Sequence, residues 1–108
     1  MWGICLDISI YGGKLFQHVV EYRLSDNEKA VVIQPFSGIE IDMKHIKSLD
    51  IPPKFVYGDT VIPADRPDKT GIIKDIIWHF EKGEPYYHIG IDNRMISRRY
   101  YGAELIGK

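Results

Sequence analysis

The sequence has one cysteine, no long apolar run and almost no net charge. With Cys5 alone, no intramolecular disulfide can form, and nothing points to an oxidising compartment. No stretch approaches the roughly 20 apolar residues of a membrane-spanning helix. The first residues lack the basic start and the small-residue cleavage site of a secretion signal. We therefore expect a cytoplasmic protein that makes no membrane contact.

The charge balance restricts the class of partner. Lys and Arg number 14 and Asp and Glu 15, for a formal net charge of −1. Because non-specific affinity for nucleic acid comes mainly from clustered Lys and Arg, this balance argues against binding by bulk electrostatics. Any basic site must be local.

The residues that are present favour β-structure. The 108 residues, 44% hydrophobic and 27% charged, suit one globular domain or two small halves. Helical periodicity is scarce, β-branched and aromatic residues are frequent, and turn signals recur about every eight to twelve residues, so an all-β fold is predicted. The expected strands cover residues 3–10, 15–24, 29–36, 38–43, 55–62, 71–80, 86–92 and 95–100.

The turns have local causes. Polar clusters at 25–28 and 81–84 should each close a hairpin, because their residues tolerate positive φ or bond their own backbone. The next reversal is predicted at 92–94, with Asn93 in the left-handed conformation. Residues 64–71 should form an exposed loop.

Two consecutive prolines in 44–54 predict the connection between an N-terminal half, 1–50, and a C-terminal half, 55–108. An offset of about 57 residues aligns Leu15, Phe16, Val19, Val20 and Val32 with Ile72, Ile73, Ile76, Ile77 and Ile89. Almost none of the aligned residues are identical, so only the pattern of apolar positions repeats. Two similar small barrels would explain it, and so would the chance alignment of two runs of strands.

The C-terminal half resembles a known architecture. "YGDTVI" opens it, "GIIKDIIWHF" is a long bent strand, and "YYHIGIDNRMISRRYYGAEL" closes it. This order resembles the five-stranded SH3-like barrel of the Tudor and KOW type, and the fold prediction becomes one or two such barrels. The tyrosine, glycine, serine, arginine and leucine pattern at the end also resembles small uncharacterised bacterial proteins. Neither resemblance implies an activity.

Alternation along the strand after the second hairpin places Tyr87 and Ile89 on the core face and Tyr86 on the opposite face. The polar pair at 74–75 interrupts the isoleucines of the long strand. A β-bulge is predicted there, which would place Trp78 near the barrel rim.

Three arginines near the C-terminus have two interpretations. Arg98 or Arg99 can bond a carboxylate such as Glu104 or Asp59 and stack on a tyrosine ring, which is a structural role. Alternatively, both form a binding surface with Arg94. The sequence leaves both open.

Five aromatic residues of this half have the same two interpretations. They are Tyr57, Trp78, Tyr86, Tyr100 and Tyr101. Grouped at a rim, their rings would stack a base, capture a cation or anchor a partner. In so small a core they would equally supply buried area.

We expect no catalytic, metal or cofactor site. His79 and His88 flank one hairpin, but a zinc ion needs three or four ligands. Cys5 lies in an expected strand, where a small buried hydrophobe is the ordinary explanation. No nucleophile stands at a catalytic spacing from a base, and no glycine-rich phosphate loop occurs.

The sequence thus favours a non-enzymatic module that binds a protein partner. Its candidate binding residues are Tyr57, Lys74, Trp78, Tyr86, Arg94, Arg98, Arg99 and Tyr100. One alternative is nucleic-acid binding, through the basic residues Lys69, Lys74, Arg94, Arg98 and Arg99 with stacking by Trp78 or Tyr86. Another is an immunity or antitoxin-like protein, which differs only in the identity of its protein partner.

Overall fold

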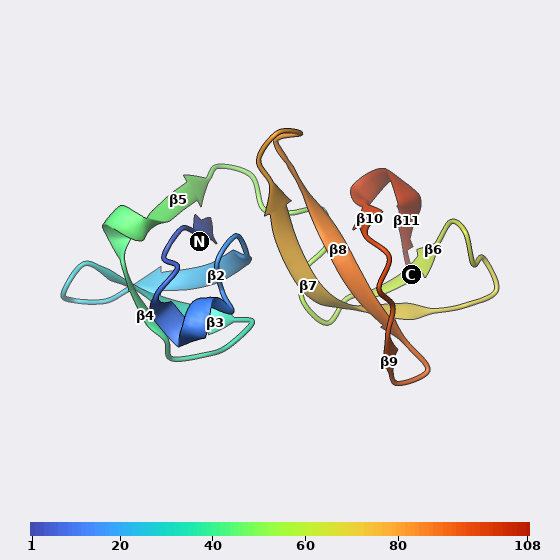
Figure 1. Cartoon of the computed structure of the whole chain (residues 1–108), viewed down its shortest axis with the longest axis horizontal. Helices are drawn as coiled ribbons and strands as arrows, with labels where there is room; N and C mark the ends of the chain where they lie inside the picture. Colours follow the sequence, from blue (N-terminus) through green and yellow to red (C-terminus); the bar gives the residue numbers. More distant parts are fainter. The chain divides into compact units, whose positions relative to one another are not determined.

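The computed structural model describes all residues, 1–108, and divides the chain into two compact units, Met1–Pro52 and Pro53–Lys108. Each unit, shown in Figure 1, consists of antiparallel strands and short 3-10 turns, with no α-helix. The all-β prediction is therefore confirmed. None of the helical turns is long and apolar enough to span a lipid bilayer.

The first unit is one five-stranded sheet. Its elements are β1 (Trp2–Cys5), η1 (Ile10–Gly13), β2 (Val19–Leu24), β3 (Lys29–Gln34), β4 (Glu40–Asp42), η2 (Met43–His45) and β5 (Ile46–Leu49). The strand order is β4-β3-β2-β1-β5, so the last strand pairs with the first. The core gathers side chains from every strand: Cys5, Leu15, Val20, Tyr22, Ala30, Val32, Ile41 and Ile46.

The second unit repeats this arrangement. Its elements are β6 (Thr60–Pro63), β7 (Gly71–His79), β8 (Glu84–Ile91), β9 (Arg94–Met95), β10 (Tyr100–Tyr101), η3 (Gly102–Glu104) and β11 (Leu105–Gly107). The order is β10-β8-β7-β6-β11, and β9 also pairs with β8. In both units a 3-10 turn precedes the last strand, and the second strand carries a register shift, at Glu21/Tyr22 in β2 and at Ile73/Asp75 in β7.

The predicted hairpins and bulge are confirmed. Each predicted turn contains positive φ values, at Glu28 (59°), at Gly83 (64°), and at Asp92 (51°) and Asn93 (65°). The β7 register shifts where the polar pair at 74–75 interrupts the isoleucines. An extra residue at this point lets one strand curve while keeping apolar side chains on the core side. Residues 64–70 are exposed, as expected of the loop.

Burial along β8 also follows the prediction, with one exception. Tyr87 and Ile89 are buried in the core, at 1% and 0% exposure. Tyr86 lies on the opposite face of the sheet and is nevertheless only 8% exposed. Its neighbours on that face explain this burial and are described below.

Several expected strands are shorter than predicted. Residues 15–17 form turns in place of the start of 15–24, because Gln17 has a φ of 68°. Residues 55–59 are also irregular, since the Asp59 carboxylate accepts a hydrogen bond from the Val56 amide at 2.9 Å and closes a turn. Local side-chain bonds of this kind compete with strand pairing.

Two further predictions were wrong at element ends. The expected connection at 44–54 contains β5, which pairs with β1 along its whole length. The strand expected at 95–100 ends at Met95, and pairing with β8 resumes only at β10. In both cases long-range pairing, which local patterns do not encode, determines the element.

Candidate functional site

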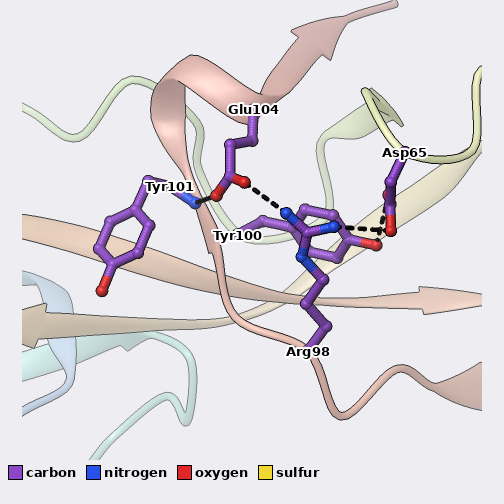
Figure 2. A network of polar contacts seen from close by, with 5 residues as sticks. All are labelled: Asp65, Arg98, Tyr100, Tyr101 and Glu104. Atoms are coloured by element: carbon purple, nitrogen blue, oxygen red, sulfur yellow. Dashed lines mark hydrogen bonds and ion pairs between the residues drawn. The ribbon is translucent and has the colours of Figure 1, made fainter.

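The two tyrosines of β10 point to opposite faces of the second sheet. Tyr100 pairs with Tyr87 and is fully buried, whereas Tyr101 pairs with Tyr86 and is partly exposed. Figure 2 shows their side chains pointing in different directions. We call the face that carries Tyr86 and Tyr101 the outer face.

Arg98 is held on the Tyr100 side by two carboxylates. Its Nη1 lies 2.8 Å from Asp65 Oδ2, and its Nη2 donates to Glu104 Oε2. The guanidinium carbon sits 4.7 Å from the centre of the Tyr100 ring, and the Tyr100 hydroxyl donates to Asp65 Oδ1 at 2.8 Å. Glu104 Oε1 accepts from the Tyr101 amide at 2.9 Å (Figure 2). We call Asp65, Arg98, Tyr100 and Glu104 the Arg98 clamp.

The clamp ties three segments of the second unit together. Asp65 belongs to the exposed loop 64–70, Arg98 to the irregular stretch before β10, and Glu104 to η3. Of the two carboxylates expected near Arg98, Glu104 is a partner and Asp59 is not, because Asp59 bonds the Val56 amide. A guanidinium that bridges two carboxylates and lies over a ring has the geometry of a structural arginine.

The clamp makes Asp65 a source of pH-dependent stability. Partial desolvation alone would raise the pKa of Asp65, but hydrogen bonds from Tyr100 and Arg98 and the Arg98 charge together lower it below the ordinary 3.8. A carboxyl whose folded-state pKa is depressed stabilises the fold above its ordinary pKa, and this contribution is lost as pH falls through the folded value.

We therefore expect Asp65→Asn to be less stable than wild type at neutral pH, with the difference shrinking as pH falls below 3.8. Denaturant titrations from neutral pH to about pH 2, followed by fluorescence, measure this difference. Trp78 is the reporter, in a Trp2→Phe background, because the chain has two tryptophans and only Trp78 lies in the second unit. A difference that stays constant with pH would contradict the assignment.

On the outer face, Tyr86 is the centre of a second group. Its ring makes edge contacts with the rings of His79, His88 and Tyr101, at centroid distances of 6.4, 5.7 and 6.2 Å. The guanidinium of Arg99 lies 4.5 Å above the ring. These neighbours account for the burial of Tyr86 on a face that alternation assigns away from the core.

Cations cover this group of rings. Arg99 is exposed above Tyr86, and the ammonium of Lys82 lies 4.0 Å from the centre of the Tyr101 ring. His88 Nδ1 lies 3.8 Å from Asp75 Oδ2. We call His79, Lys82, Tyr86, His88, Arg99 and Tyr101 the cation–ring cluster. Cation–π contacts at exposed positions contribute about 0.5–1 kcal/mol each. These cations can therefore leave the rings and bind another group at a small cost in free energy.

The other end of the same face has an open hollow of about 390 Å³. Pairing across four strands aligns Thr60, Ile72, Gly90 and Met95 in one row. The lining also includes Thr70, Lys74, Asp92, Asn93 and Arg94. Tyr86, His88 and Gly90 alternate with the buried residues of β8, so the cluster and the hollow lie along one strand.

The eight sequence-predicted site residues thus separate into distinct places. Tyr86 and Arg99 are in the cation–ring cluster, Lys74 and Arg94 line the hollow, and Arg98 and Tyr100 belong to the clamp. Tyr57 donates its hydroxyl to the Ile76 carbonyl at 3.4 Å, and desolvation raises its pKa. Trp78 pairs with Pro85 at the end of β7. Tyr100 lies in the core, whereas Tyr86 and Tyr101 lie on the outer face, so these rings do not share one surface.

Sequence reasoning missed Lys82 as a cover of the Tyr101 ring, and it considered His79 and His88 only as metal ligands. No group of three or more His, Cys, Asp or Glu residues is arranged to hold a metal ion. The hollow was also missed, although a glycine inside a strand often marks a site where a ligand or another part of the chain comes close to the backbone. Gly90 carries that signal, but its cross-strand neighbours follow only from the register.

Cys5 lies in the core of the first unit at 0% exposure. Its Sγ is 3.8 Å from the Asp7 carbonyl oxygen, and burial raises the pKa of the thiol. A neutral, buried thiol is poorly nucleophilic.

Residues 37–106 match the model of a family of unknown function (DUF6960). The match covers more than half of the 108-residue chain, so the chain belongs to that family. No curated protein and no solved structure matches the chain. The expected relation to an uncharacterised family is confirmed. The matched segment contains the clamp, the cluster and the hollow.

Proposed function

We propose that the protein is a non-enzymatic interaction module that binds a protein partner through the outer face of the second sheet. The observation that carries this proposal is the combination on one face of a cation-covered tyrosine cluster and a hollow with exposed apolar walls. Ile72 is 42% exposed and Met95 is 55% exposed, while Arg99 and Lys82 lie over rings. Tyrosine, arginine and methionine are enriched where protein partners meet.

We further propose that both units are small SH3-like barrels. The support is topological. In each unit four strands form a meander, to which the second unit adds the short β9, a 3-10 turn comes next, and the last strand pairs with the first. A register shift in the second strand of each unit is consistent with the bend that such a barrel needs. The fold class by itself implies no activity.

The absence of enzymatic activity is part of the proposal. Its support is that Cys5, the most nucleophilic residue type in the chain, is buried with a raised pKa, and that Asp65 is engaged by Arg98 and Tyr100. We also propose a cytoplasmic location, because a lone unpaired thiol suits a reducing compartment.

Nucleic-acid binding is the weaker alternative. A stacking platform must offer a ring face to a base. The ring of Tyr86 is 8% exposed and already covered by Arg99, and the residues that line the hollow include no aromatic ring. An immunity or antitoxin-like role remains within the proposal, since it specifies only which protein is bound.

Quantitative affinity capture from the native cell tests the proposal. We expect Arg99→Ala to weaken binding of the captured protein about tenfold or more, since arginine anchors over aromatic rings are frequent hot spots. Arg23→Ala, an exposed arginine of the first unit, is the matched control and should bind like wild type. Equal binding by Arg99→Ala and wild type, or recovery of nucleic acid in place of protein, would reject the proposal.

A further inference from the structure

We infer that the hollow over Gly90 receives an apolar side chain from an acidic segment of the partner protein. This inference rests on the proposed function and specifies the chemistry of the partner. It follows from the shape of the hollow, from the charges at its rim and from the kinds of side chain that line it.

The shape comes from a missing side chain. Gly90 lies in the middle of β8, between Ile72 on β7 and Met95 on β9. A Cβ built on Gly90 would be 3.2 Å from Lys74 Cε and 3.5 Å from Lys74 Cγ. The aliphatic stem of Lys74 therefore passes directly over the backbone of Gly90. With the exposed side chains of Ile72 and Met95, it gives the hollow apolar walls that fit an aliphatic group.

The charges at the rim are unbalanced. Lys74 and Arg94 are exposed, and neither takes part in the ion pairs of the structure. The acidic residue of the hollow, Asp92, is already engaged by Lys69 at 3.5 Å. Two cations thus stand beside an apolar hollow without a counter-charge of their own. Carboxylates on either side of an inserted aliphatic side chain would complement them.

The lining favours a peptide over a nucleic acid. No aromatic ring lines the hollow, so bases would have nothing to stack on. The hollow is open and runs across neighbouring strands, which suits an extended segment that inserts one side chain. The hydroxyls of Thr60 and Thr70 supply donors for the backbone carbonyls of that segment.

A display selection of random twelve-residue peptides on the full-length protein tests the inference. We expect the enriched sequences to carry Asp or Glu around one aliphatic residue. Gly90→Ala should weaken the best peptide about tenfold in fluorescence anisotropy, because the added methyl would meet the Lys74 stem at 3.2 Å and displace this wall of the hollow. The double variant Lys74→Glu/Arg94→Glu should weaken it by at least as much.

The variants have matched controls. Gly90→Ala should stay folded, since its backbone φ is not in the positive region and the nearest atom is the flexible end of Lys74. Gly107→Ala is the control for a strand glycine, with only an ordinary contact to Phe55 at 3.4 Å, and Lys29→Glu is the control for charge in the first unit. Both should bind the peptide like wild type.

Each other outcome overturns the inference. The selection could enrich basic or neutral peptides, or no peptide at all. The best peptide could bind Gly90→Ala as tightly as wild type. A single-stranded oligonucleotide could displace the peptide. If Arg99→Ala weakens the native partner while Gly90→Ala does not, the hollow is not the contact but the proposed function stands. If neither weakens it, both are rejected.

Discussion

Replacing Tyr100 with alanine is expected to lower the free energy of unfolding of the second unit by about 3–5 kcal/mol. The ring is fully buried, so its removal leaves a cavity and forfeits the contact with Arg98 at 4.7 Å. Because a small domain is stable by only about 5–15 kcal/mol in total, this loss is a large fraction of the whole. The clamp would lose its central member together with the hydroxyl that bonds Asp65.

Tyr100→Phe is the matched control. It keeps the ring and the stacked Arg98 and removes only the hydrogen bond to Asp65, so its loss should be much smaller. Denaturant unfolding followed by Trp78 fluorescence in a Trp2→Phe background measures both variants. Equal destabilisation by the two substitutions would mean that the hydroxyl, and not the packing of the ring, dominates.

The second large effect is expected in the first unit, where Gly3→Ala should destabilise the fold by about 1–3 kcal/mol. β1 is paired on both sides, with β2 and β5. A Cβ on Gly3 would lie 2.7 Å from Ile46 Cγ2, 3.1 Å from the Lys47 carbonyl oxygen and 3.1 Å from Tyr22 Cε1. Backbone and a buried ring cannot move away as a flexible chain end can, so the clash must displace β5.

Gly107→Ala, in β11, serves as the control for this prediction. Its added methyl would meet only Phe55 at 3.4 Å, so we expect a neutral or slightly stabilising effect, as for most glycines replaced within strands. Trp2 fluorescence in a Trp78→Phe background measures Gly3→Ala in the first unit, and Trp78 fluorescence in a Trp2→Phe background measures Gly107→Ala in the second. Unchanged stability of Gly3→Ala would show that β1 and β5 are not packed as described.

The candidate site changes how the C-terminal arginines are understood. Adjacent in sequence, Arg98 and Arg99 serve different faces, because one is clamped between Asp65 and Glu104 and the other covers Tyr86. A double substitution would confuse loss of stability with loss of binding. Arg99 is therefore the position at which a binding role is tested.

The strand patterns, hairpin turns and bulge of the second unit were predictable because each depends on neighbours in sequence. Alternation assigned Tyr87 and Ile89 to the core, and Asn93 was expected at positive φ for its local backbone chemistry. Strand β5 and the return of pairing at β10 were not predictable in this way. β5 pairs with β1 at the other end of the first unit, and Tyr100 pairs with Tyr87 only after the irregular residues 96–99.

The same distinction between local and long-range interactions holds for the candidate site. Composition and period-two patterns act locally, and they were enough to predict an all-β chain whose arginines and tyrosines gather in the second half. Three contacts could be found only in the folded sheet: Asp65 is the second partner of Arg98, Arg99 covers Tyr86, and a hollow lies over Gly90 between Ile72 and Met95. These relations depend on the register between strands, and register follows from the packing of the whole sheet.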